Sequence, residues 1–394
     1  MIEAYAQWLM RWRWTVLLVS AVTVVLVASG ARLLEFQNDY RIFFSKENPQ
    51  LMAFDQLQDT YTKNDNVLFV LAPKDGNVFT GETLAVVADV TERAWQTPYS
   101  IRVDSVTNFQ HTYADGDDLT VADLVEEPQG LSNQELATVR QVALSEPLLV
   151  RRIVSPLGHV TAVNITIELP GRNQETEVPE VVSSVRALAD YVRTTHPGVD
   201  VYLSGIVMMN NAFPEASKLD MQTLMPMAFA AILIMVLLQL RGFTGTVGTF
   251  LVIVFSIVVA MGAAGWLGIG LSPPLMSAPV IVLTLSVADC VHILTNWMQG
   301  MRGGLDKKSA MVESLRINAS PVFLTSITTA IGFLSLNFSD APPFRDLGNV
   351  SAIGVMAAWA LSMGLLPALV TLLPSRVRAR GGHRPVLMDR FAGL

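Results

Sequence analysis

A single carboxylate, Asp289, lies within an apolar run that is long enough to cross a lipid bilayer. The run is Leu275–Trp297, with the sequence LMSAPVIVLTLSVADCVHILTNW. An ionisable side chain at membrane depth costs about 3 kcal/mol on insertion scales, so membrane proteins keep such groups mainly to move protons or ions. His292 follows three residues later and shares a helix face with Asp289. A carboxylate and an imidazole in this register predict part of a proton relay.

Further polar side chains extend this pattern. Ser286 and Asn296 lie on the same helix face as Asp289, which predicts one polar stripe on an otherwise apolar helix. A later apolar run offers hydroxyl groups that can support the acid across a helix interface: Thr325, Ser326, Thr328 and Thr329. Two interpretations remain open, a relay in the bundle interior and a buried acid with a purely structural role. The hydroxyls can equally bond to carbonyls of their own helix, and His292 lies nearer the end of its run, where water reaches.

The composition indicates an integral membrane protein with a sizeable soluble part. The chain has 394 residues, of which 51% are hydrophobic and 15% charged, whereas a soluble domain has about 25% charged residues. The formal net charge of −7 argues against a nucleic acid as partner. Acidic residues outnumber basic ones two to one between Glu35 and Lys218, and the remainder is net basic. The single cysteine, Cys290, cannot form a disulfide within the chain.

Six apolar stretches approach or exceed the ~20 residues that a membrane span needs. The first is separated from the other five by a long mixed segment. This predicts an N-terminus at 1–13, a first span at 14–34, a large domain at 35–222, a five-span bundle at 223–373 and a basic tail at 374–394. The first stretch also has features of a cleaved signal peptide, but its long core favours a retained span. The six stretches are Trp14–Leu34, Thr223–Leu240, Phe243–Trp266, Leu275–Trp297, Ala319–Phe338 and Asn349–Leu373.

The orientation follows from the distribution of Lys and Arg, which gather on the cytoplasmic side of membrane proteins. Basic residues precede the first span, separate spans two and three and spans four and five, and follow the sixth span. Of the two remaining short loops, one has no basic residue and the other has Arg345 alone. We therefore expect a bacterial-type cytoplasmic membrane protein with both termini in the cytoplasm and the large domain outside.

Hydrophobic periodicity predicts an α/β fold for the large domain. Strands are expected at 66–72, 101–106, 158–169 and 199–203, and helices at 81–95 and 178–195. Because strand, helix and strand follow one another twice, the domain is expected to be of the ferredoxin-like, split βαβ type. The polar, acidic stretch 110–135 is interpreted as an exposed loop or insertion. The predicted fold class is thus an α-helical bundle of six spans with an α/β, ferredoxin-like extracytoplasmic domain between spans one and two.

Enzyme motifs are absent from the sequence. It contains no GxSxG, phosphate-loop, HExxH or CxxC pattern. We therefore expect neither an enzyme nor a bound cofactor or metal, and without a nucleotide motif the energy for transport would come from an ion gradient. Small residues in span six, Ser351, Gly354 and Ala358, predict close helix packing.

Three segments resemble the resistance-nodulation-division (RND) superfamily, and most closely its MMPL-type branch of hydrophobe exporters. SVADCVHIL (Ser286–Leu294) is similar to the fourth-span motif, Phe323–Val355 to the fifth and sixth spans with their loop, and Asn38–Gln58 to the start of the porter domain. One span, a large domain and five spans form the half-unit of this superfamily. The chain departs from it at Cys290, where tyrosine is usual, and in having one unit where members usually have two.

The resemblance implies proton-driven export of lipids or other hydrophobic molecules. Asp289 and His292 would then carry the proton, with Ser286, Asn296, Thr325, Ser326 and Thr329 in support. The expected partners are a lipid-like substrate, membrane lipids, and a second unit supplied by a homodimer, a higher oligomer or a separate half. Two other functions stay open: a sterol-sensing or receptor-like module and an accessory subunit of protein translocation. A titratable acid favours export or translocation over a sensor.

Overall fold

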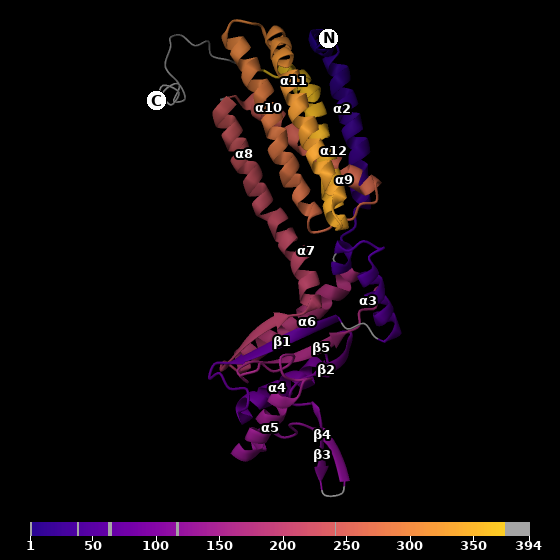
Figure 1. The fold of residues 1–394 in the computed structure, drawn as a ribbon. Coiled ribbons are helices and arrows are strands. Elements are labelled where there is room, and N and C mark those ends of the chain that lie inside the picture. Colours follow the sequence, from indigo (N-terminus) through magenta and orange to yellow (C-terminus); the bar gives the residue numbers. More distant parts are fainter. Residues whose placement is uncertain (1, 38, 62–64, 116–117, 241, 375–394) are drawn as a thin grey trace, which may run out of the picture. The chain divides into compact units, whose positions relative to one another are not determined.

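The structure, a computed structural model, describes residues 2–37, 39–61, 65–115, 118–240 and 242–374 (Figure 1). The chain divides into two compact units. The membrane unit is formed by residues 1–37, 42–45 and 217–394, and the sheet unit by residues 38–41 and 46–216. Helix α7 (Ile206–Gln222) runs from the sheet unit into the membrane unit.

Six long apolar helical segments occur in the described part of the chain, which confirms the six predicted spans. Each is long enough to cross a bilayer, and most run beyond the apolar core that the sequence defines. The segments are Arg13–Leu33, Ile206–Leu240, Phe243–Trp266, Leu275–Arg302, Lys307–Phe338 and Pro342–Leu372.

From α8 onward, the helices of the membrane unit follow one another with short connections. Helix α1 (Ile2–Arg11) precedes α2 (Arg13–Ala28), which continues into a 3₁₀ turn at Ser29–Leu33. The bundle then comprises α8 (Leu224–Leu240), α9 (Phe243–Trp266), α10 (Ala278–Arg302), α11 (Lys307–Leu334), α12 (Pro342–Met363) and α13 (Leu365–Leu372). A short 3₁₀ turn at Leu275–Ser277 precedes α10, and another at Ser335–Phe338 follows α11.

Glycines allow two helix pairs of the membrane unit to approach closely. A Cβ atom on Gly262 of α9 would overlap the carbonyl oxygen of Val27, and one on Gly265 would overlap that of Gly30. On α12, a Cβ atom on Gly354 would overlap Val282 of α10. The predicted close packing of span six at this glycine is therefore confirmed, because small residues let helix backbones approach.

The sixth span contains a break between two helices. Helix α12 ends at Met363 and α13 begins after Gly364. The backbone carbonyl of Met363 would normally accept the N–H four residues later, but that residue is Pro367, which has none. The phenol of Tyr5 in α1 donates to this carbonyl at 3.3 Å instead. A tyrosine of the first helix thus provides the hydrogen bond that the carbonyl of Met363 lacks at the break in the last span.

The sheet unit contains a four-stranded sheet in the order β2-β5-β1-β6. Its strands are β1 (Asp65–Pro73), β2 (Ser100–Asp104), β5 (Thr161–Ile167) and β6 (Val199–Ser204), and all neighbouring pairs are antiparallel. Helix α4 (Gly81–Ala94) connects β1 to β2, and α6 (Gln174–Thr195) connects β5 to β6. The four predicted strands and two predicted helices of this unit are confirmed.

The core of the sheet unit lies between one face of the sheet and these two helices. Val67, Phe69 and Leu71 alternate along β1 and are fully buried, as period-two spacing requires. Leu84 of α4 and Val185 of α6 are fully buried in the same cluster.

The stretch 110–135, expected to be an exposed loop or an insertion, is not an irregular loop but has secondary structure of its own. Its first part forms a hairpin of β3 (Gln110–Asp115) and β4 (Asp118–Asp123), and α5 (Asn133–Ser145) begins near its end. The strands contain β-favouring residues that the high Asp content obscures. A capping box starts α5, in which Ser132 and Glu135 each bond to the other's backbone N–H.

The segment before β1 is held by one arginine. Helix α3 (Pro49–Thr60) starts at an Asn48 cap whose side chain accepts the N–H groups of two following residues. Arg41 forms ion pairs with Asp39 at 3.0 Å and Asp55 at 3.2 Å. These contacts tie the residues preceding α3 to the helix itself.

Candidate functional site

Asp289 occupies the middle of α10 and is 8% exposed. The Oγ atom of Ser326 in α11 lies 3.3 Å from its Oδ2 atom. Among the described residues Asp289 forms no ion pair and no other side-chain hydrogen bond. Four further carboxylates lie in the long helices, but near their ends: Glu215, Asp220, Glu313 and Asp346.

The hydroxyl of Ser326 has one proton to donate and two possible acceptors within reach. Its Oγ lies 2.8 Å from the carbonyl oxygen of Val322 in its own helix and 3.3 Å from Asp289. A hydroxyl donates one hydrogen bond and accepts two. When Asp289 is ionised, Ser326 must turn its proton away from Val322 to reach the carboxylate. When Asp289 is protonated, the acid can donate to Ser326 while Ser326 keeps its bond to Val322. The two protonation states therefore select different hydrogen-bond arrangements between α10 and α11.

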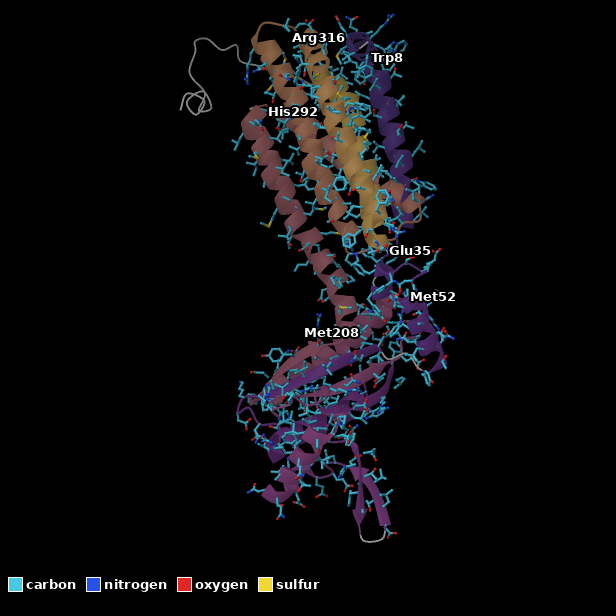
Figure 2. All side chains as sticks on the ribbon, viewed as in Figure 1. Trp8, Glu35, Met52, Met208, His292 and Arg316 are labelled. Atoms are coloured by element: carbon cyan, nitrogen blue, oxygen red, sulfur yellow. The ribbon has the colours of Figure 1, made fainter. Side chains whose placement is uncertain are left out.

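The other members of the predicted stripe have separate environments. Ser286 is fully buried and donates to Val282 of its own helix at 2.6 Å. Asn296 donates to the side chain of Asn318 in α11 at 3.0 Å. His292, labelled on α10 in Figure 2, is exposed and has no hydrogen-bond partner in the described part of the chain.

Of the predicted supporting hydroxyls on α11, Ser326 is the one placed at Asp289. The hydroxyl of Thr325 donates to backbone carbonyls of Pro321 and Val322, and that of Thr329 donates to Thr325. Both threonines therefore bond to their own helix, as Ser and Thr often do in apolar helices. The structure does not bring them to the acid.

Two residues of this interface escaped the sequence analysis. Ser314 donates to the carbonyl of Ile293 across the helices at 2.6 Å, and Asn318 donates back to Ser314 at 2.8 Å. Both side chains are buried. A signal was available, because Ser314, Asn318 and Ser326 share one face at multiples of four residues. It was missed because the predicted apolar span begins only at Ala319.

Helices α10 and α11, which run side by side in Figure 1, are thus joined by a column of polar contacts. Asp289 is the titratable member of this column. The single cysteine, Cys290, is buried beside it with a free thiol. Within the described ranges, no group of His, Cys, Asp and Glu is arranged to hold a metal ion. The arrangement can hold or release one proton in an apolar surrounding.

Comparison with known proteins decides the family. The model of the MMPL family matches residues 46–387. The chain belongs to the MMPL family. It is therefore a membrane protein of a family that contains named transporters.

Two kinds of relative are found. A putative membrane protein of Methanocaldococcus jannaschii, MJ1562, is 21% identical over 361 residues, which cover 90% of this chain and 89% of that protein. The siderophore exporter MmpL5 of Mycobacterium tuberculosis is 26% identical over 216 residues, 54% of this chain and 22% of the exporter. The putative membrane protein YdgH of Bacillus subtilis is 22% identical over 57% of this chain and 26% of that protein. The match thus spans about a quarter of these two longer relatives.

Proposed function

We propose that this MMPL protein is a proton-motive-force-driven exporter of lipids or other hydrophobic molecules, in which Asp289 takes up and releases the proton. It would act in a cytoplasmic membrane with both termini inside. The sheet unit would be a ferredoxin-like porter domain on the outer side. The observation that carries the proposal is a buried carboxylate at membrane depth whose one side-chain partner is a hydroxyl that is already bonded elsewhere.

The physical step is a change of charge between two packed helices. An ionised carboxylate in an apolar bundle is unfavourable unless it is well hydrogen-bonded. Protonation removes this charge. The hydroxyl of Ser326 can then donate its hydrogen bond to the backbone carbonyl of Val322. Because α10 and α11 share this contact, the protonation state biases their packing. Repeated protonation from one side and release to the other would drive alternate conformations.

The sheet unit supports the proposal through its topology. Antiparallel strands in the order β2-β5-β1-β6, with helices after β1 and β5, are what a ferredoxin-like fold with an inserted hairpin would have. The names of relatives include a siderophore exporter and transport proteins. A siderophore or another amphiphile is therefore a reasonable first class of cargo to test.

The test is transport by the purified full chain in proteoliposomes. A fluorescent short-chain phospholipid serves as the hydrophobic probe, and a trapped pH dye reports proton movement. An imposed pH gradient should drive probe movement and should be dissipated faster when the probe is present. Asp289→Asn keeps the size and hydrogen bonding of the side chain but cannot titrate, so both signals should fall to the level of empty vesicles.

The matched control is Asp220→Asn, which removes an exposed carboxylate outside the apolar part of the second span. It should transport as the unsubstituted protein does. Transport by Asp289→Asn at the unsubstituted rate would refute the assignment of the acid. Binding of the probe without gradient-driven movement would favour the receptor-like function instead.

A further inference from the structure

Helix α1 has an exposed aromatic face. Tyr5, Trp8 and Trp12 recur at spacings of three and four residues, which places them on one side of the helix and of the residue that follows it. Their side chains are 39%, 52% and 50% exposed, and the rings of Tyr5 and Trp8 stack with their centroids 6.4 Å apart. Trp8 and Arg316 are labelled at the same end of the membrane unit in Figure 2.

Another face of α1 holds the helix against the membrane unit. Ala6, Leu9 and Met10 are buried, and they belong to the same apolar cluster as Met311 and Leu315 of α11. One side of α1 is therefore fixed to the bundle. Its aromatic face is left uncovered by the described part of the chain and meets whatever surrounds the protein.

The aromatic face adjoins the lipid-facing side of the first span. Helix α1 ends at Arg11 and α2 begins at Arg13, and the backbone N–H of Trp12 between them bonds to the carbonyl of Trp8 at 3.0 Å. The first turns of α2 expose large aliphatic side chains, as a helix in contact with lipid does. These side chains are Leu18, Val19 and Val22. The aromatic rings thus lie at the polar end of a span, where Trp and Tyr are favoured because one part of the ring is apolar and another can bond to water or headgroups.

Two cations accompany the aromatic rings. Arg11 is exposed one turn from Trp8, and Arg13 is partly exposed next to Trp12. Neither arginine forms an ion pair or a side-chain hydrogen bond with a described residue. The one acid of α1, Glu3, is eight residues before Arg11, or about 12 Å along the helix axis. The edge of the aromatic face is therefore positively charged, which favours an anionic headgroup over a zwitterionic one.

We propose that α1 carries a binding site for an anionic phospholipid, whose headgroup phosphate lies at Arg11 and Arg13. The acyl chains of this lipid lie against Trp8 and Trp12. A guanidinium group suits this role, because its planar set of N–H donors can bind two phosphate oxygens at once. The site does not depend on the proposed transport function, since it involves neither Asp289 nor a cargo.

The bound lipid acts on the sixth span through Tyr5. The ring of Tyr5 stacks on Trp8, and its phenol donates to the carbonyl of Met363 at the break between α12 and α13. A lipid that fixes Trp8 therefore also holds the phenol on this carbonyl. The lipid stabilises the broken form of the sixth span, in addition to anchoring α1.

The first test is fluorescence quenching of the full chain in phosphatidylcholine nanodiscs. Phosphatidylglycerol or phosphatidylcholine, each brominated near the headgroup end of its acyl chains, is included at increasing mole fraction. Quenching should be stronger with brominated phosphatidylglycerol, because the anionic lipid gathers at Trp8 and Trp12. The excess should disappear when Trp8→Phe and Trp12→Phe are combined. Equal quenching by the two brominated lipids overturns the site.

The role of the arginines is tested in the same assay. Arg11→Gln should raise the mole fraction of phosphatidylglycerol needed for half of the excess quenching about fivefold, the usual contribution of one arginine near anionic lipid. The matched control is Arg302→Gln, because Arg302 is exposed and ends α10 as Arg11 ends α1, but the one tryptophan of α10 is buried. It should leave the mole fraction unchanged.

Two outcomes overturn the headgroup assignment. One is an equal effect of Arg11→Gln and Arg302→Gln, which would mean that any cation at this end of the bundle attracts the lipid. The other is reversal of the quenching by sodium phosphate beyond that by sodium chloride of the same ionic strength. This result would assign the arginines to a soluble anion.

The second test is thermal denaturation of the full chain in a neutral detergent, with and without phosphatidylglycerol. The lipid should raise the unfolding midpoint more than the same amount of phosphatidylcholine does. Tyr5→Phe keeps the stacked ring but removes the phenol donor, so the rise should shrink in this variant. Tyr113→Phe, on the exposed hairpin, is the control and should keep the full rise. An unchanged rise in Tyr5→Phe overturns the link to the sixth span, and the quenching assay then decides the lipid site by itself.

Discussion

The two buried carboxylates among the described residues differ in the number of hydrogen bonds that they accept. Glu177 in the sheet unit accepts the backbone N–H groups of Gly171, Arg172 and Asn173 at 2.9 to 3.1 Å. Asp289 in the membrane unit has the shared hydroxyl of Ser326. Three fixed donors favour the charged form of an acid, whereas an apolar site with one shared donor leaves the charged form poorly stabilised. The hydrogen bonds of Glu177 are those of a structural acid, and the few hydrogen bonds of Asp289 agree with the proton-carrying role proposed for it.

Glu177 should stabilise the start of α6 in a pH-dependent way. Burial disfavours its charge, but the three N–H groups outweigh this and lower its pKa from the ordinary value of 4.5. A lowered folded-state pKa means that the stabilisation is present at pH values above 4.5 and is lost as the pH falls through the folded-state pKa. Glu177→Gln in the full chain should therefore speed hydrogen exchange of residues 171–182 at neutral pH.

The difference between Glu177→Gln and the unsubstituted protein should shrink as the pH falls through the lowered folded-state pKa of Glu177, because the native carboxyl is then itself protonated. Glu168→Gln is the control, because that carboxylate is exposed. Equal exchange in the two variants at neutral pH would contradict a stabilising role of the three N–H groups.

At the scale of the element, the break in the sixth span shows how one helix depends on another. Pro367 leaves the carbonyl of Met363 without its usual donor, and Tyr5 supplies a replacement from α1. At the other end of α13, the ammonium group of Lys307 in α11 donates to the carbonyl of Leu373 at 3.1 Å. Both ends of this short helix are therefore held by side chains of other helices, which satisfies backbone groups that lipid cannot.

The contribution of Tyr5 can be isolated with a double-mutant cycle. Tyr5→Phe removes one hydrogen bond and should lower the stability of the purified protein by about 1 kcal/mol. Pro367→Ala restores an N–H group four residues after Met363, so Tyr5→Phe should cost clearly less in that background. Thermal denaturation in detergent measures both. Tyr113→Phe, on the exposed hairpin, is the control and should be neutral. A Tyr5→Phe effect of the same size in both backgrounds would exclude the carbonyl as its target.

At the scale of the whole molecule, the distribution of Lys and Arg predicts which side of the membrane each unit occupies. The described helices give the six spans but not their direction. With one predicted span before the sheet unit and five after it, we expect both termini on one side of the membrane and the sheet unit on the other. The basic tail at 374–394 lies almost entirely outside the described residues and contributes to this argument through its sequence alone.

Labelling with a membrane-impermeant maleimide tests the orientation. In a Cys290→Ala background, a cysteine replacing the exposed Asp118 of β4 should react in intact cells whose outer barrier is permeable to the reagent. A cysteine replacing the exposed Lys308 of α11 should react only after the cells are lysed. The reverse pattern would place the sheet unit in the cytoplasm and remove the basis for an outside porter domain.

The sequence alone was sufficient for the features that depend on period and composition. Long apolar runs need no tertiary contact to become spans. Hydrocarbon offers no hydrogen-bond partners, so the backbone N–H and C=O groups must bond to one another within a helix. The strands around Phe69 and Ile165 were predicted for a similar reason, since alternate burial appears directly as alternate residue types. Asp289 stood out because a charge in an apolar run is conspicuous.

Only the tertiary structure decided which side chains meet. Sequence spacing treats Thr325, Ser326 and Thr329 alike, yet the rotation of α11 about its axis points Ser326 alone of these three toward Asp289. The polar column through Ser314 and Asn318 and the bond from Tyr5 to Met363 join residues that are distant in the chain. The hairpin at 110–123 depends on cross-strand pairing, which a polar composition conceals. Such contacts depend on how elements pack, and packing is a property of several segments at once that no single segment encodes.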